Sequence, residues 1–182
     1  MTNAIVLLSG GIDSAACALL LKSQMKDIRG LFVDYGQAAS ELERPAAEKI
    51  AEWLQINLNV LRVESPLQFS AGRIPGRNGL LVSGALTYGE LHTGVIALGV
   101  HAGAPYYDCS ERFVTRINEL IQEYTDGRVS VAAPFLTWCK ADIVQFCRDR
   151  GLPLGKTYSC ERGHNPPCGE CNSCRDRAAL NC

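Results

Sequence analysis

The sequence has little of what would place the protein in a membrane or on a nucleic acid. A membrane-spanning helix needs about 20 apolar residues in a row, and the longest apolar stretch, residues 4–21, is interrupted by Ser9, Gly10, Gly11 and Asp13. Basic residues number 18 against 19 acidic ones, so the basic excess typical of a nucleic-acid-binding face is missing. The N-terminus carries no basic leader of the secretory type. We therefore expect a cytoplasmic protein, with neither a membrane nor a nucleic acid as its partner.

Two common nucleotide-binding patterns are also missing. The Gly-x-Gly-x-x-Gly pattern of dinucleotide-binding folds follows none of the predicted strands. Residues 151–157 read G-L-P-L-G-K-T, but a Walker loop has four residues between its glycines and follows a strand. We interpret this segment as the end of a helix followed by a loop.

What the sequence does contain is enough apolar residues for a core and an unusual number of cysteines. Of 182 residues, 47% are apolar and 20% are charged, which fits one globular domain or one domain with a small appendage. The nine cysteines cannot all pair with one another because their number is odd. Four of them cluster near the C-terminus at metal-ligand spacing, which indicates a reducing compartment.

Apolar runs alternate with segments of helical period along most of the chain. Short buried strands are predicted at residues 4–8, 28–33, 58–63, 95–100 and 129–132. Amphipathic helices are predicted at residues 12–22, 47–54, 79–93 and 113–124, and around Ile143, Val144 and Cys147. This order predicts an α/β fold, a doubly wound parallel sheet of about five strands. We assign residues 1–155 to a nucleotide-binding α/β domain and residues 156–182, where the period stops, to a zinc-binding C-terminal appendage.

The segment S-G-G-I-D-S at residues 9–14 follows the first predicted strand and opens a helix. Two glycines allow a ligand to approach the backbone closely, and the free N–H groups at a helix start favour an anion. Ser9 and Ser14 add hydroxyl donors, while Asp13 would repel a bare phosphate and so suggests magnesium or an orienting hydrogen bond. A strand–helix turn with ordinary caps is the alternative interpretation.

The cysteine cluster reads Cys160-x7-Cys168-x2-Cys171-x2-Cys174. Four thiolates complete a closed tetrahedral zinc site, which is structural rather than catalytic. An iron–sulfur cluster also takes four cysteines, although the ferredoxin spacing would require a cysteine at position 178, where the chain has Ala178. A redox pair at Cys168 and Cys171 is a further alternative. Zinc is the interpretation that we favour.

Taken together, these motifs resemble those of the 7-cyano-7-deazaguanine synthase family, which belongs to the pyrophosphate-loop ATPases. Further matching segments follow in the family's order: Y-G-Q at residues 35–37, I-P-G-R-N at 74–78, Y-D-C at 107–109, P-F-L-T-W-C-K-A-D at 134–142, T-Y-S-C at 157–160 and C-G-E-C-N-S-C at 168–174. The resemblance runs nearly end to end in a shortened and diverged chain.

The resemblance implies an ATP-dependent carbon–nitrogen ligase. Such an enzyme adenylates the carboxylate of 7-carboxy-7-deazaguanine, forms an amide with ammonia, and converts the amide to the nitrile in a second activation. The implied cofactors are ATP, Mg²⁺ and Zn²⁺, and a homodimer is considered as the assembly. Positioning and charge stabilisation would supply most of the catalysis.

The resemblance also suggests roles for individual residues. Pyrophosphate and magnesium would be held by the loop residues Ser9, Gly10, Gly11, Asp13 and Ser14. Gln37 would contact the nucleotide, or else cap the following helix. Lys140 would reach a phosphate from the start of the last helix of the body, or else remain a solvated lysine.

Three more residues are assigned to the substrate. Arg77 would pair with a phosphate or the substrate carboxylate through its planar fork, Asn78 would read a base edge, and Asp108 would accept from the deazaguanine amino edge or cap a helix. Cys160, Cys168, Cys171 and Cys174 would bind zinc. His101 and His164, which no motif includes, are interpreted as structural or surface residues.

The chain also departs from the family pattern. Ala38 and Ala39 stand where the pattern has Arg-His, and residues 101–106, H-A-G-A-P-Y, replace an acidic Glu-Thr-Asp run. These changes leave three alternatives beside the nitrile-forming synthase. A diverged ligase would pass the acyl group to another amine, on a small molecule or a protein terminus, as in antiviral defence. The others are a tRNA-thiolating pyrophosphate-loop enzyme and a non-catalytic zinc-stabilised binding module.

Overall fold

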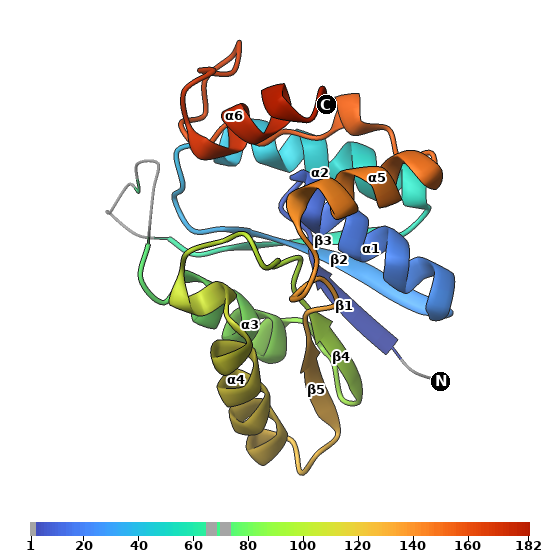
Figure 1. The fold of residues 1–182 in the computed structure, drawn as a ribbon. Coiled ribbons are helices and arrows are strands. Elements are labelled where there is room, and N and C mark those ends of the chain that lie inside the picture. The colour runs from blue at the N-terminus through green and yellow to red at the C-terminus, as the bar shows by residue number, and fades with distance from the viewer. Residues whose placement is uncertain (1–2, 65–68, 70–73) are drawn as a thin grey trace.

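The computed structural model describes residues 3–64, 69 and 74–182 (Figure 1). Five parallel strands form a single sheet in the order β3-β2-β1-β4-β5. The strands are β1 (Asn3–Leu7), β2 (Asp27–Asp34), β3 (Asn57–Arg62), β4 (Gly94–Ala97) and β5 (Val129–Ala132). The helices are α1 (Ile12–Gln24), α2 (Ser40–Leu54), α3 (Arg77–Tyr88), α4 (Glu111–Tyr124), α5 (Lys140–Asp149) and α6 (Asn172–Ala179). The predicted α/β fold class is confirmed.

Both faces of the sheet are covered by helices. Side chains that alternate along β1 explain why: Ala4 and Val6 join the apolar core beneath α1, α2 and α5, while Ile5 and Leu7 join the core beneath α3 and α4. In Figure 1 these two helical layers lie on opposite sides of the sheet. A strand buried on both faces reads as a continuous apolar run, which is why the sequence revealed it.

All five strands are parallel, but the chain adds them first on one side of β1 and then on the other. The chain runs outward from β1 through β2 to β3, and then returns to place β4 and β5 on the other side of β1. Ligands of such sheets bind beyond the carboxyl ends of the strands at this reversal. The loops after β1, β2 and β4 therefore meet at one crevice.

The helices differ from the predictions chiefly in three places. The helical stripe at residues 47–54 belongs to α2, which begins at Ser40. The helix predicted at residues 79–93 is α3, which begins at Arg77 and ends at Tyr88, and β4 begins at Gly94. Helix α6 was not predicted at all, because its residues include Cys174 and several charges but carry no apolar stripe. Its position depends on contacts that a helical period does not encode.

The tail lies against the α/β body. The Tyr158 backbone N–H donates to the Gly10 carbonyl at 2.9 Å, and the Arg148 guanidinium donates to the Leu180 carbonyl at 2.6 Å. Figure 1 shows α6 and the C-terminus on the side of the sheet that carries α2 and α5. The boundary between two domains at residue 155 stays a prediction.

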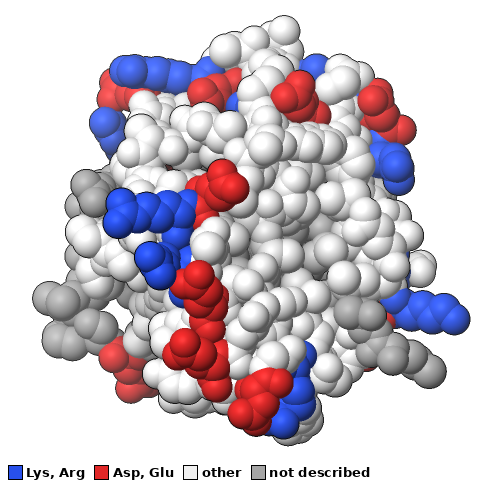
Figure 2. Space-filling model, turned by 60° about the horizontal axis from the view of Figure 1, so that its bottom comes forward, with Lys and Arg blue, Asp and Glu red and all other residues white. Residues whose placement is uncertain are grey.

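The surface agrees with the nearly balanced charge of the chain. Figure 2 shows basic and acidic side chains next to one another on the face it presents, and the described residues form no broad basic area there. Within the ranges that the structure covers, every helix is too short or too polar to cross a membrane.

Candidate active site

The loop between β1 and α1 is shaped by two serine side chains. The Ser14 hydroxyl accepts from the Ser9 backbone N–H at 3.2 Å and donates to the Gly11 carbonyl at 3.0 Å. The two hydroxyl oxygens of Ser9 and Ser14 lie 3.1 Å apart. No side chain caps the start of α1, so the first N–H groups of that helix are available to an anion.

Gly10 allows this loop to lie directly against α2. Its φ of +84° falls in the left-handed region, and a Cβ there would meet the Glu43 carbonyl oxygen at 2.4 Å and the Ala47 backbone nitrogen at 2.8 Å. Any larger residue would be strained and would force the loop away from the helix. The position thus requires glycine for two separate reasons.

Asp13 and Lys140 form an ion pair beside the loop. The Lys140 Nζ lies 2.6 Å from each carboxylate oxygen of Asp13, although the residues are 127 positions apart. Each occupies the first turn of its helix, α1 or α5. The pair places one positive and one negative group beside the start of α1.

His101, interpreted from the sequence as a structural or surface residue, lies next to this pair. Its Nε2 is 3.9 Å from Oδ2 of Asp13, and its Nδ1 accepts the Gly103 backbone N–H at 3.0 Å. Because Nδ1 accepts this hydrogen bond, the one proton of a neutral His101 ring lies on Nε2. No motif could have identified His101, because only the fold brings the loop after β4 to α1.

Gln37 is held by the protein at the end of β2. Its Oε1 accepts the Tyr35 backbone N–H at 2.9 Å, and its Nε2 donates at 3.2 Å both to the Val33 carbonyl and to Oε2 of Glu43. Both protons of the amide group are therefore used within the protein. Glu43, which no motif included, is the residue that this amide positions.

Arg77 and Asn78 begin α3, and Asp108 lies in the short 3-10 helix η1 (Tyr107–Cys109). The Asn78 side-chain amide, which is buried, donates to the Asp108 carbonyl at 2.7 Å. The Asp108 carboxylate accepts the Asn78 backbone N–H at 3.3 Å and so stabilises the start of α3. Ser110, rather than Asp108, caps α4 through the Phe113 N–H at 3.2 Å.

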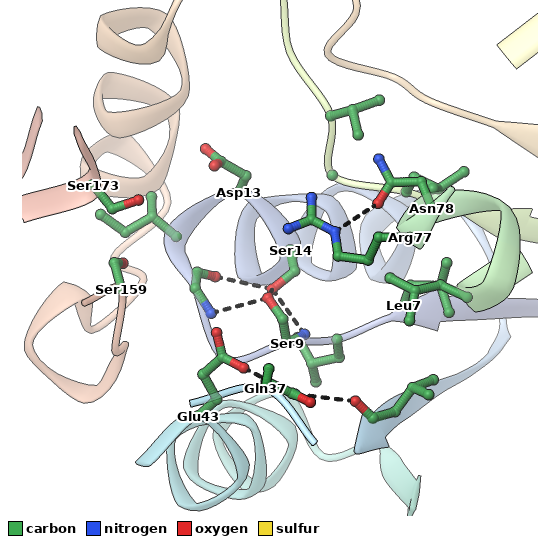
Figure 3. Close-up of a pocket in the computed structure, with 18 of the residues that line it drawn as sticks. Leu7, Ser9, Asp13, Ser14, Gln37, Glu43, Arg77, Asn78, Ser159 and Ser173 are labelled. Carbon is green, nitrogen blue, oxygen red and sulfur yellow. Dashed lines mark hydrogen bonds between the residues drawn. The ribbon is translucent and has the colours of Figure 1, made fainter. Parts of the chain in front are cut away.

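Two adjoining cavities open at the carboxyl ends of the strands. The first, of about 270 Å³, lies over the loop and includes Asp13, Lys140 and Asn78 in its lining (Figure 3). The second, of about 550 Å³, lies beside it and includes His101 and Ala39. The residues that line both cavities come from the body and the tail: Asp13, Tyr35, Gln37, Glu43, Arg77, Gly99, Val100, Glu161 and Ser173. Asp108 lines neither cavity.

The tail contributes part of both linings. Tyr158, Ser159 and Arg177 line the first cavity, and the start of α6 lines the second. The Arg177 guanidinium donates to the Thr157 hydroxyl at 2.9 Å and to the Ser159 hydroxyl at 3.1 Å. The position of the tail therefore determines the shape of the site.

The four clustered cysteines form a possible metal site. The ligand atoms of Cys160, Cys168, Cys171 and Cys174 all lie within 4.8 Å of one another, and the sulfur atoms of Cys168 and Cys174 are 3.9 Å apart. Zinc–sulfur bonds of about 2.3 Å in a tetrahedron would separate the sulfurs by about 3.8 Å. The donor set and its spacing fit a metal ion such as zinc.

Backbone N–H groups point at these sulfur atoms. The Sγ of Cys160 accepts from the Cys168 N–H at 3.4 Å, and the Sγ of Cys168 accepts from the Cys171 N–H at 3.4 Å. Burial would raise the pKa of Cys160, but these and neighbouring N–H donors outweigh it and lower that pKa to about 6. The pKa of Cys168 is also lowered, chiefly by the N–H groups of Cys171 and Glu170. Such donors stabilise thiolates, the form that binds a metal.

Sequence comparison shows which proteins the chain resembles. The family model described as "Queuosine biosynthesis protein QueC" matches residues 3–72 and 67–180. A 7-cyano-7-deazaguanine synthase from a Sulfurihydrogenibium species is 32% identical over 204 aligned positions, covering 96% of this chain and 92% of that protein. The corresponding protein of Aquifex aeolicus is 31% identical and covers 95% of this chain and 93% of its own length.

Comparison of structures agrees on the fold. An NMN synthetase from Francisella tularensis has a TM-score of 0.54 at 18% identity, covering 85% of this chain and 63% of that one. The U34-tRNA thiolase NcsA from Methanococcus maripaludis, which carries a [4Fe-4S] cluster, has a TM-score of 0.53 at 14% identity, covering 99% of this chain and 73% of its own. At these identities the likeness establishes the architecture alone.

Proposed function

Because this chain belongs to the family of queuosine biosynthesis protein QueC, the 7-cyano-7-deazaguanine synthases, we propose that it activates a deazaguanine carboxylate with ATP and joins it to an amine. The proposed substrate is 7-carboxy-7-deazaguanine, and the family's reaction would take it through the amide to the nitrile. The observation that carries the proposal is the phosphate-binding loop, whose cavity opens into a second cavity of suitable size for another molecule.

The first cavity would hold ATP. The loop backbone and the hydroxyls of Ser9 and Ser14 would bind the phosphates at the start of α1. Asp13 would hold magnesium, which neutralises phosphate charge when bound. Lys140 already lies at this position and would pair with a phosphate once the carboxylate of Asp13 takes a metal.

The substrate carboxylate would lie where the two cavities meet. Arg77, which lines both, offers a planar guanidinium suited to a carboxylate or a phosphate. A carboxylate oxygen is a poor leaving group. When it attacks the α-phosphate of ATP and pyrophosphate is released, it becomes part of a good leaving group, AMP. Asn78 and Asp108 are hydrogen-bonded to each other. We therefore propose that this pair supports the wall beside Arg77 and that backbone groups of the wall recognise the base.

The cysteine cluster would hold zinc as a structural metal. Its four ligands leave no open position for a substrate, so the metal would fix α6 and the Tyr158 segment against the body. An iron–sulfur cluster would instead favour a thiolating enzyme. Metal analysis separates the two, since zinc at about one per chain supports the ligase and iron with sulfide supports thiolation.

One incubation tests the main proposal. The protein is mixed with ATP, magnesium and 7-carboxy-7-deazaguanine, with and without ammonium, and the products are followed by mass spectrometry. Nitrile, AMP and pyrophosphate are expected when ammonium is present. The absence of any substrate-dependent ATP consumption would sink the proposal and would leave the thiolating enzyme and the binding module as the remaining interpretations.

The second cavity favours one alternative, a ligase that uses a larger amine. The positions at which the chain departs from the family pattern line this cavity: Ala38, Ala39, His101, Gly103, Ala104, Pro105 and Tyr106. Most of these side chains are small, and about 550 Å³ exceeds what ammonia requires. Methylamine, glycinamide and a short peptide with a free N-terminus are therefore compared with ammonium. Amide products formed faster from these amines than from ammonium would favour the alternative, and conversion with ammonium alone would exclude it.

A further inference from the structure

The wall between the two cavities contains three carboxylates. Asp13, Glu43 and Glu161 each line both the first and the second cavity. An activated carboxylate at this wall would face the second cavity, from which an amine would approach. Each of the three carboxylates is therefore a candidate to act on that amine.

Two of the three carboxylates are already committed to other groups. Asp13 has Lys140 at 2.6 Å from both of its oxygens. Oε1 of Glu161 accepts from both the backbone N–H and the hydroxyl of Ser173, at 3.1 and 2.9 Å. These contacts occupy both oxygens of Asp13 and one oxygen of Glu161.

Glu43 differs from both. It lies in the first turn of α2, and its one side-chain hydrogen bond among the described residues comes from the neutral Gln37 amide, at 3.2 Å. Figure 3 shows one oxygen of Glu43 joined to Gln37 and the other turned away from it. The carboxylate is therefore oriented without being neutralised.

Some groups around Glu43 raise the pKa of its carboxyl, and others lower it. Burial raises the pKa of the Glu43 carboxyl, and the nearby carboxylate of Asp34 raises it further, while the Gln37 amide and the Arg77 guanidinium lower it. Tyr35 and Tyr158 also face it and are affected by its charge. The net effect is a carboxylate that is more basic than usual, as a proton acceptor near neutral pH must be.

The second cavity has the charge to receive a cation. Its lining holds four carboxylates and two guanidinium groups: Asp13, Glu43, Glu161, Asp176, Arg77 and Arg175. Ammonia and primary amines are ammonium ions near neutral pH, and a lining with an acidic excess attracts them. Such an ion cannot attack a carbonyl carbon until it loses a proton.

We infer that Glu43 is the catalytic base that takes this proton, with Gln37 as its positioning residue and the second cavity as the route of the amine. The inference rests on the proposed function and specifies its second step, the attack of the amine on the activated carboxyl group. Glu43 takes one proton from the ammonium nitrogen, whose lone pair then forms the C–N bond with the activated carboxyl carbon. The C–O bond to the phosphate breaks, and AMP leaves with that electron pair. The second nitrogen proton goes to the departing phosphate or to water, and Glu43 releases its own proton to water.

Glu43→Gln tests the inference, because the amide keeps a partner for Gln37 but is not a base. Three rates are measured in the parent and the variant. These are ATP–pyrophosphate exchange dependent on 7-carboxy-7-deazaguanine, amide formation with ammonium, and hydroxamate formation with hydroxylamine. Hydroxylamine is largely unprotonated at neutral pH and needs no base to free its lone pair.

We expect exchange to stay within about threefold of the parent, because adenylation does not use Glu43. Amide formation from ammonium falls about 100-fold at neutral pH and recovers as pH rises and free ammonia accumulates. Hydroxamate formation falls much less than amide formation. Glu41→Gln, an exposed acid in the same turn of α2, is the matched control and changes none of the three rates.

Three results would overturn the inference. Amide formation at the parental rate would show that Glu43 is not the base. Equal losses in all three rates would show that Glu43 supports ATP binding or folding instead. A parent without substrate-dependent exchange would refute the proposed function itself, whereas normal exchange with an unaltered amide rate in the variant refutes only this step.

Discussion

The α/β body and the cysteine-rich tail build the same pair of cavities, but they are held together by different forces. The body buries one apolar core on each face of its sheet. The tail has no comparable core: its buried cluster consists of Cys160, Cys171 and Cys174, with Tyr158 and Cys168 packed beside them. A segment this short cannot bury enough apolar surface to hold itself. The hydrophobic effect therefore fixes the body, whereas the tail is tied to the body by hydrogen bonds and gathers four thiols whose spacing fits a metal ion.

The largest expected effect is a loss of activity caused by a substitution in the α/β body that leaves the tail unchanged. Asp13→Asn keeps the shape of the side chain but removes the charge that would bind magnesium and that orients Lys140. Release of AMP, measured by chromatography, should fall about 1000-fold, while the thermal unfolding midpoint changes little. Asp126→Asn, an exposed substitution in the loop before β5, is the control. Parental turnover in Asp13→Asn would contradict the role assigned to Asp13.

The next effect separates the tail from the body. Cys171→Ser removes one of four ligands, so the zinc content determined by mass spectrometry should fall from about one per chain to almost none. Without the metal, hydrogen exchange should rise in α6 and in the Tyr158 segment but not in β1 or α1. Activity should fall about 100-fold because α6 lines the second cavity.

Cys139→Ser is the matched control for the metal. Cys139 is exposed and precedes α5, and serine serves well at a helix N-terminus. Its zinc content and exchange pattern should match the parent. Loss of protection throughout the body of Cys171→Ser would mean that body and tail fold as one unit.

A third effect concerns the contact between α2 and Gly10 of the β1–α1 loop. Gly10→Ala would place a methyl group 2.4 Å from the Glu43 carbonyl oxygen at a φ of +84°, and we expect a loss of about 2–3 kcal/mol in the free energy of unfolding. Gly155→Ala, where nothing lies within 4 Å of the added carbon, should change it by less than about 0.5 kcal/mol. Urea titration measures both, and equal values would show that the loop can move away from α2.

The smallest effect is a difference in pH dependence at the shared wall. Because burial raises the pKa of Glu43 in the folded protein, the folded state binds its proton before the unfolded state does as pH falls. Its contribution to stability is therefore complete below the unfolded pKa and is lost as pH rises through the folded pKa. Glu43→Gln cannot lose stability in this way. Its unfolding free energy relative to the parent should rise as pH increases above the usual glutamate pKa of about 4.3, and a constant difference would contradict the raised pKa.

The features that could be predicted from sequence are those encoded by neighbouring residues. The strand β1 is a continuous apolar run, and the phosphate loop is six residues long with its own internal hydrogen bonds. The cysteine cluster is similarly local, and its ligand atoms do come together. These elements needed only the period of a strand, the chemistry of a helix start and the spacing of a metal site.

Other features were hidden because they arise from contacts between distant segments. Helix α6 has no apolar stripe, so its helical period carries no signal. Glu43 and His101 belong to no motif, and they reach the site only because α2 begins, and the loop after β4 lies, at the same edge of the sheet. Gln37 was expected to contact a nucleotide or to cap the following helix, and only the structure shows its amide directed at Val33 and Glu43. Its contact with a nucleotide stays a prediction.

The sequence by itself determined the fold class and the family, because apolar periods and short motifs follow one another in a recognisable order along the chain. The roles assigned to the loop at residues 9–14 and to the four clustered cysteines stay predictions. Only the tertiary structure decided which charges meet. Lys140 pairs with Asp13 across 127 positions, and three carboxylates share one wall between two cavities. The physical reason is that the reactivity of a charged group depends on burial and on its neighbours in space, and the order of strands in the sheet determines both.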